Sequence, residues 1–378
     1  MKRNYILFLI IITLIHSCAK PKQQELLKYD LIFENSFAIE LDSLTKRNHE
    51  ISYFNENEEN LYVYNDLIHS IYQFDIRNQT QSLVIPLKKE GPNEVNKVEA
   101  IIKAPEAEMF YLITNIGNLV KIDSTGKVIS KEQFLVRDNG DASLTHRPRF
   151  FINNDKIYVS VRPNNTTDKE FSFLAFSGIN YSKTEYVFPH PKNSNIGNYA
   201  NLMNEAKLVY VDSKNTFVVS LPFSDHLFTY NLNENITDKF LAKSNLMLDP
   251  IKFKPNNNIN YSSNYLMSNS WYLNLLYDRT NKIYYRLGSI GVDLSRGDPR
   301  KGEFYSNNEN GYYHTLLMMD ENFEKVGEIK GLNVPNYSFV NKGKLYVPNF
   351  EKEHDNEDVL IFDIYSIEEK VYETNSNF

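Results

Sequence analysis

Short apolar runs separated by polar turns recur along the chain and predict β-strands. The runs have about five to seven residues and are bounded by Asn, Asp and Gly, which is typical of antiparallel strands and too short for helices. One run in every repeat follows a tight polar turn, and we interpret it as the second strand of a unit. These second strands are expected at residues 61–65, 110–114, 157–161, 217–221, 283–287 and 345–349.

A third apolar run completes the repeat and ends in a small polar residue. These end residues are Asp75, Asp123, Ser177, Asn231, Asp320 and Asp363. They recur at about 40–55 residues, the period of propeller blades, except for one longer interval.

The repeat predicts an all-β fold, a β-propeller of six four-stranded blades. A β-sandwich or a pair of β-domains is the rival interpretation. The long interval from Asn231 to Asp320 hides a seventh blade or holds an insertion. We favour a polar insertion at residues 288–311, because second- and third-strand runs flank it.

An alternating segment, residues 31–41, precedes the first unit. We expect it to add a strand to the last blade and close the ring, which removes two exposed sheet edges. Residues 29–378 are therefore predicted to form a single propeller domain.

The N-terminus has the features of an export signal. Lys2 and Arg3 precede an apolar run at residues 5–15, which is too short to span a bilayer as a helix. The run ends before Cys18, the chain's sole cysteine, as in bacterial lipoprotein signals. We expect a signal peptide at 1–17, a lipidated N-terminus and tether at 18–28, and a location in the cell envelope at the outer membrane. The alternative is an ordinary signal peptide with a chance cysteine.

The anchor, the six units and the segment Glu90-Gly91-Pro92-Asn93-Glu94 after the first unit resemble exported bacterial propeller lipoproteins. The nearest match is the domain-of-unknown-function family 4221. The resemblance spans nearly the whole mature chain. It implies the fold and the envelope address, and it supplies no mechanism.

Composition and charge narrow the partners. Tyr, Phe and Trp make up 13% of the chain, which favours strands, and the net charge is −7. An acidic chain without a basic block does not suit nucleic acid. The expected partners are the membrane, through the acyl chains, and a protein or small anionic ligand.

No catalytic or metal-binding motif stands out. The eight histidines lack zinc spacing, and we interpret Ser224-Asp225-His226 as a loop between strands rather than a triad. We therefore expect a binding or scaffold module that is not an enzyme and needs no cofactor or metal. One alternative is a hydrolase or lactonase with axial acids and Asn, with or without calcium. Another is a subunit of an envelope uptake complex.

One basic cluster is the candidate ligand site. In a propeller, loops that enter first strands and loops between second and third strands share one face, so distant cations can meet at one channel mouth. Such a mouth suits carboxylate or phosphate groups. The candidate residues are Arg147, Arg149, Arg286, Arg296, Arg300 and Lys301. The alternative is that these residues are solvated charges on loops that pair with the excess of acidic residues.

Overall fold

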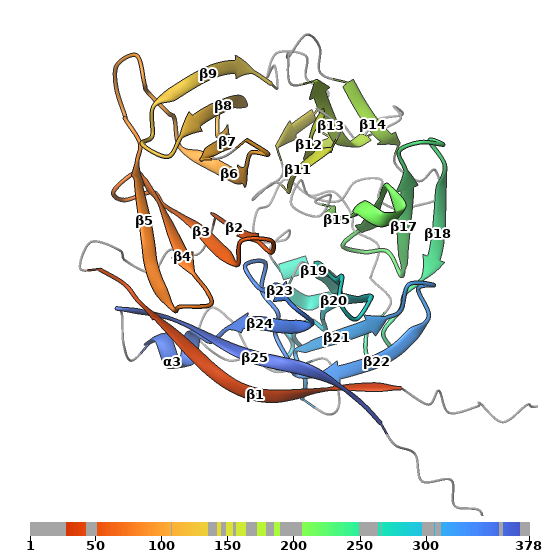
Figure 1. Ribbon diagram of the computed structural model, residues 1–378. Coiled ribbons are helices and arrows are strands. Elements are labelled where there is room, and N and C mark those ends of the chain that lie inside the picture. Colours follow the sequence, from red (N-terminus) through yellow and green to blue (C-terminus); the bar gives the residue numbers. More distant parts are fainter. Residues whose placement is uncertain are drawn as a thin grey trace, which may run out of the picture.

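The computed structural model shows antiparallel sheets arranged around a common centre (Figure 1). The residues it describes are 28–42, 51–106, 108–134, 142–144, 149–153, 156–163, 172–178, 185–189, 206–248, 264–265, 267–296, 306, 311–354 and 358–370.

Two sheets from the first third of the chain have the simple up-and-down order that the repeat predicts. The first consists of β2 (Ile51–Asn55), β3 (Asn60–Asn65), β4 (Ser70–Asp75) and β5 (Thr80–Pro86). The second consists of β6 (Val98–Lys103), β7 (Met109–Thr114), β8 (Asn118–Asp123) and β9 (Val128–Gln133).

Two sheets from the second half repeat that order. One consists of β15 (Lys207–Val211), β16 (Thr216–Ser220), β17 (His226–Asn231) and β18 (Thr237–Leu241), with a 3-10 turn, η3 (Asp212–Lys214), after β15. The other consists of β19 (Trp271–Asp278), β20 (Ile283–Ser289), β21 (His314–Met319) and β22 (Lys325–Lys330).

The last sheet joins the two ends of the chain. It contains β23 (Phe339–Asn341), β24 (Lys344–Pro348) and β25 (Val359–Glu369), with a short helix α3 (Phe350–His354) between β24 and β25. β1 (Tyr29–Glu40) pairs antiparallel with β25 from Tyr29↔Glu369 to Glu40↔Val359. β1 therefore supplies the outermost strand of a sheet whose other strands come from the end of the chain.

The third unit departs from the predicted four-strand form. Its strands are β10 (Ala142–Leu144), β11 (Phe150–Asn153), β12 (Lys156–Pro163), β13 (Ser172–Gly178) and β14 (Glu185–Pro189), and both β10 and β11 pair with β12. The structure thus describes five four-stranded blades rather than the predicted six, plus this five-stranded sheet. The all-β propeller prediction is confirmed at the level of architecture.

Burial on both faces explains the continuous apolar second strands. In β3 every residue after Asn60 is buried, because each face of the sheet packs against a neighbouring sheet. One hydrophobic cluster joins β3 and β4 to β6 and β7, and another joins them to β1 and β25. Four more clusters join the remaining neighbouring pairs of described sheets.

Polar residues at the ends of third strands act as turn acceptors. The Asp75 carboxylate accepts the Asn78 amide, and Asp123 accepts the Thr125 amide, each at 2.9 Å. Asn231 and Asp320 do the same in their own turns. These side chains satisfy backbone donors that the strand ladder leaves unpaired.

The long interval contains no further sheet among the described residues. β20 pairs directly with β21, with Ser289 opposite His314, so the segment between them is a connection, as predicted. Part of the extra length lies elsewhere, between β18 and β19. None of the described helices is long and apolar enough to cross a membrane.

Candidate functional site

An axial cavity of about 610 Å³ lies where the innermost strands meet. Residues of β2, β6, β11, β15, β19 and β23 line it, and Figure 1 shows these strands turned toward the centre. Each is the edge strand of its sheet, so unpaired backbone groups face the cavity. We call this cavity the axial channel.

Arg149 lies in the axial channel, directly before β11. Its Nη2 donates to Asn274 Oδ1 and to the Asn336 backbone carbonyl, both at 3.3 Å. Asn274 belongs to β19 and Asn336 precedes β23, so the side chain bridges different sheets. Burial lowers the pKa of the Arg149 guanidinium. Among the described residues no carboxylate lies within ion-pair distance of it.

Two polar side-chain atoms of the channel lining have no hydrogen-bond partner in the described part of the chain. Ser338 is 3% exposed, and its hydroxyl makes no hydrogen bond to the described part of the chain; the same holds for Asn336 Oδ1. Both residues line the axial channel beside Arg149. A buried polar group without a partner costs about 1–3 kcal/mol, so a polar group or water that paired with these atoms would be favourable.

The other end of the channel carries paired charges. Arg279, in the β19–β20 turn, lies 2.8 Å from Asp212 and 3.7 Å from Glu56. Lys103, at the end of β6, lies 3.4 Å from Glu58. Burial raises the pKa of Glu56, and Arg279 offsets only part of this effect.

Arg286 requires a correction, because it does not reach a channel mouth. Its side chain is 0% exposed and lies between two sheets, with its guanidinium carbon 3.3 Å from the centre of the Tyr272 ring. Nε donates to Ser220 Oγ at 2.9 Å, Nη1 to the Ala242 carbonyl and Nη2 to the Ser224 carbonyl, both at 2.6 Å. These acceptors make Arg286 a buried structural residue. Burial lowers its pKa to about 10.

Of the remaining predicted cations, the structure describes Arg296. Arg296 is exposed in the connection between β20 and β21. The hydrogen bonds from Ser295 lower the pKa of Asp293 there, and the charge of Arg296 adds to this effect. Arg147, Arg300, Lys301 and the lipid-attachment candidate Cys18 lie outside the described residues.

Ser224-Asp225-His226 forms a turn without triad geometry. Ser224 Oγ accepts the backbone amide of His226 at 3.1 Å, and the Asp225 carboxylate pairs with Lys243 at 3.2 Å. Within the described ranges, no group of three His, Cys, Asp or Glu is arranged to hold a metal ion. The turn instead supplies carbonyls to Arg286.

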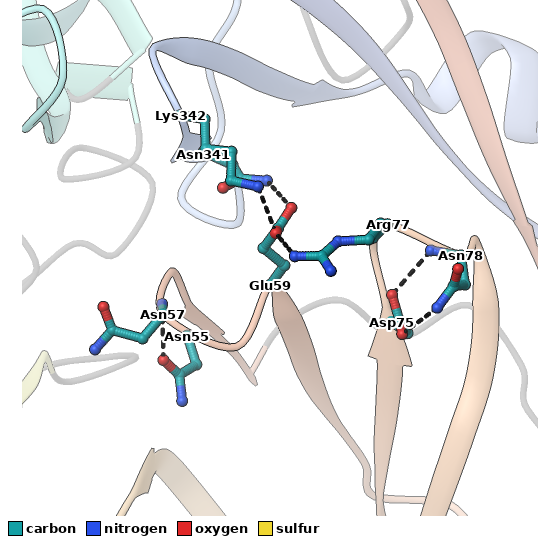
Figure 2. Close-up of polar contacts among 8 residues, drawn as sticks. All are labelled: Asn55, Asn57, Glu59, Asp75, Arg77, Asn78, Asn341 and Lys342. Atoms are coloured by element: carbon teal, nitrogen blue, oxygen red, sulfur yellow. Dashed lines mark hydrogen bonds and ion pairs between the residues drawn. The ribbon is translucent and has the colours of Figure 1, made fainter.

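Glu59 ties the first and last sheets together at the same end as Arg279. It is 7% exposed and accepts hydrogen bonds from Arg77, from Lys342 Nζ at 2.5 Å and from Asn341 Nδ2 at 3.4 Å (Figure 2). The hydrogen bonds from Lys342 and Arg77 lower the pKa of Glu59 to about 2. We interpret this contact as structural, because the Glu59 carboxylate already accepts hydrogen bonds from two cations and an amide.

The turn Glu90–Glu94 is also structural. Gly91 has φ +89°, the Glu94 amide donates to the Gly91 carbonyl, and Asn93 accepts the Val128 amide. The turn lies beside a second cavity of about 290 Å³ that contains His69, Glu94 and Asn96. Both ring nitrogens of His69 are occupied, by Tyr64 Oη and the Val95 carbonyl, each at 2.8 Å.

Comparison with known proteins agrees with this architecture. A family profile described as "Domain of unknown function (DUF4221)" matches residues 28–330. The chain belongs to the DUF4221 family. No curated protein matches the chain.

Two solved structures share the fold. A DUF4221 member from Bacteroides vulgatus has a TM-score of 0.73 at 21% identity, over 92% of this chain and all of that one. A putative exported protein from Bacteroides fragilis has a TM-score of 0.52 at 13% identity, over 91% and 96%. A luciferin-regenerating enzyme is more distant, with a TM-score of 0.45 at 9% identity, over 89% of this chain and 98% of that one.

The sequence pattern made Arg149 a candidate, and the structure places it in the axial channel beside residues that the pattern did not indicate. Asn274, Asn336 and Ser338 lie 125 or more residues after Arg149 in the chain, and nothing in their local sequence marks them as channel residues. Their position at or just before first strands was the available signal. Glu56 and Arg279 stand in the same class of turn, between first and second strands, and that shared position could have paired them.

Proposed function

We propose that the protein is a binding module whose axial channel holds a small anionic ligand at Arg149. The observation that carries this proposal is a guanidinium in the channel, bonded to one amide oxygen and one carbonyl, with no carboxylate partner among the described residues. A partly desolvated Arg with unused donors favours a carboxylate or phosphate. The cavity volume is within the roughly 300–1,000 Å³ of small-molecule sites.

The test uses benzoate, hexanoate and inorganic phosphate as probes. A ligand that binds the folded state raises the free energy of unfolding, by about 1.4 kcal/mol when its concentration is ten times its Kd. The melting temperature rises as a result. We expect a carboxylate or phosphate probe to raise it, and Arg149→Gln to abolish the shift. The matched control is Arg296→Gln, which removes an exposed cation outside the channel. This variant should show the same shift in melting temperature as the parent protein. Equal shifts in the Arg149 variant contradict the proposal.

We further propose that this role is not enzymatic. An axial hydrolase or lactonase needs acids at the channel, and Glu56, Glu58 and Asp212 do line it. Arg279 and Lys103 pair with them, so they lie in a charge network rather than as free general acids and bases. An uptake-complex subunit or scaffold is compatible with the same site.

The proposed address is the outer membrane, through a lipid on Cys18. The sequence motif supports it, and the Bacteroides fragilis neighbour is described as a putative exported protein. Cys18→Ala should move the protein from the membrane to the soluble fraction or block signal processing. The proposal fails if fractionation and processing match the parent protein.

We propose that the sheet β10–β14 counts as a sixth blade and that β1 closes the ring. The hydrophobic clusters support this arrangement: two of them join β12 to the sheets on either side, and another joins β1 to β3 and β4. A crystal structure tests the count, and a gap beside β12 would contradict it.

A further inference from the structure

The axial channel is electrically polarised along its length. Because the sheets repeat one topology, their first strands run in the same direction. Arg149, Glu99 and Lys207 therefore lie where these strands begin, and Glu56, Glu58, Lys103, Asp212 and Arg279 lie where they end. The first group has one more positive charge than negative, and the second has one more negative than positive.

At each end of the channel, charge also remains that neighbouring groups do not fully neutralise. This charge is positive where the strands begin and negative where they end. At the beginning of the strands Arg149 lacks a described carboxylate partner, and the buried Ser338 hydroxyl lacks any described partner. At the far end Arg279 is shared between two carboxylates, and its 3.7 Å distance to Glu56 is long. Burial and the nearby carboxylates of Asp278 and Asp212 raise the pKa of Glu56, so extra positive charge there is favourable.

The wall between the ends suits an extended backbone. The innermost strands are edge strands, and their unpaired N–H and C=O groups are the groups that bind an added strand. β2 has five residues and spans roughly 17 Å at about 3.3 Å per residue. The two charged ends therefore lie on the order of 10–15 Å apart, the length of an extended chain of three or four residues.

We propose that the ligand is an elongated zwitterion, a short peptide with free termini, whose carboxylate binds Arg149 and whose ammonium binds Glu56 and Asp212. This inference rests on the proposed function, since it names the ligand class of the same channel. Ser338 is positioned to donate to the carboxylate beside Arg149. A free amino acid is too short to reach both ends, and a phosphate supplies no positive group for the acidic end.

The test measures Kd by calorimetry for tetraalanine with free termini, its N-acetyl form, its C-terminal amide, and dialanine. We expect the free tetrapeptide to bind about tenfold or more tightly than either capped form, since each cap removes a charge-assisted contact. Dialanine should bind as weakly as the capped peptides.

Channel variants assign each preference to one end. In Arg149→Gln, the C-terminal amide should bind as tightly as the free peptide, and the N-acetyl form should still bind more weakly. In the double variant Glu56→Gln, Asp212→Asn, the N-acetyl form should bind as tightly as the free peptide, and the C-terminal amide should still bind more weakly. Lys282→Gln, a neighbouring cation that pairs with Glu321 outside the channel lining, is the control and should change neither. Melting temperatures verify folding, and Arg149→Lys is the substitute if the Gln variant unfolds.

The outcomes separate the two proposals. Capped peptides that bind as tightly as the free one, or dialanine that equals tetraalanine, overturn the zwitterion inference. If benzoate, hexanoate or phosphate still binds in an Arg149-dependent way, the proposed function stands. If neither the peptides nor the simple anions bind, both proposals fail. The peptide comparison on the parent protein decides the question even if no variant folds.

Discussion

Gly126 shows how a single turn residue depends on a neighbouring strand. Its φ is +82°, and a Cβ built there would lie 2.0 Å from the Pro86 carbonyl oxygen. Asp123 holds the same turn by accepting the Thr125 and Lys127 amides. The position therefore excludes any side chain on both torsional and steric grounds.

We expect Gly126→Ala to lower the free energy of unfolding by roughly 3 kcal/mol, from the left-handed torsion and the clash together. Gly91→Ala is the matched control, because Gly91 has φ +89° but no heavy atom within 4 Å of its Cβ position. It should cost about 1 kcal/mol. Urea unfolding measures both, and equal losses would show that the Pro86 clash relaxes.

Arg286 is the second residue where position decides the role. We expect Arg286→Gln to destabilise the fold by about 3 kcal/mol or more, since the Ala242 and Ser224 carbonyls lose charged donors and Tyr272 loses its stacking partner. Urea unfolding gives the loss.

The same variant separates structure from binding. Probe affinity per folded molecule should be unchanged, because Arg286 does not line the axial channel. A stable variant that has lost anion binding would restore Arg286 as a ligand residue.

At the scale of elements, the turns between first and second strands follow one backbone rule. The residue before the second strand adopts a left-handed conformation in several sheets, at Glu59, Glu108, Asn215 and Lys282. A β-branched residue is disfavoured there, which explains the polar turn that precedes the second strands. Glu59 adds an inter-sheet function to this local role.

Glu59 makes the seam between the first and last sheets sensitive to acid. Its pKa is about 2 in the folded protein, against 4.5 for an ordinary glutamate. The contribution of Glu59 to the free energy of unfolding is therefore complete above about pH 5 and is lost as the pH falls toward 2.

We expect Glu59→Gln to cost on the order of 1 kcal/mol at pH 7, discounted because Arg77 and Lys342 are largely exposed. The difference from the parent should shrink as the pH falls from 5 to 2. Urea unfolding at several pH values tests this, with Glu132→Gln on the exposed strand β9 as the control. A difference independent of pH would refute the assigned role.

At the scale of the whole molecule, the two ends of the chain meet in one sheet. β1 pairs with β25 along its length and places Phe37, Ile39 and Leu41 in a cluster with β3 and β4. β1 also contacts β22 and β5, so it lies between the preceding sheet and the first sheet.

Removal of residues 29–41 should therefore unfold or aggregate the protein. Burying each of the three apolar side chains contributes about 1.5–3 kcal/mol, a large share of the 5–15 kcal/mol typical of a domain. Size-exclusion chromatography and thermal unfolding report the effect. A synthetic peptide of residues 29–41 should restore the monomeric, cooperative state, and a truncated chain with an unchanged melting temperature would show that β1 is dispensable.

The pattern in the sequence was sufficient to predict the second and third strands of each unit, the polar residues such as Asp123 at which third strands end, and the addition of the N-terminal segment to the last sheet. These features depend on neighbours within one unit or on alternation, which are visible along the chain. The five-stranded form of the third sheet was not predicted, because β10 and β11 pair one after the other with successive residues of β12, which the local pattern does not show.

Tertiary structure alone decided which charged residues form a site. Arg149 precedes a first strand and lies in the axial channel, whereas Arg286 lies within a second strand and is surrounded by carbonyls between two sheets. The sequence determined the blades, because strand formation and turn chemistry are local. The site depends on which side chains from separate blades converge at the axis, and desolvation and hydrogen bonding there are set only when the sheets pack together.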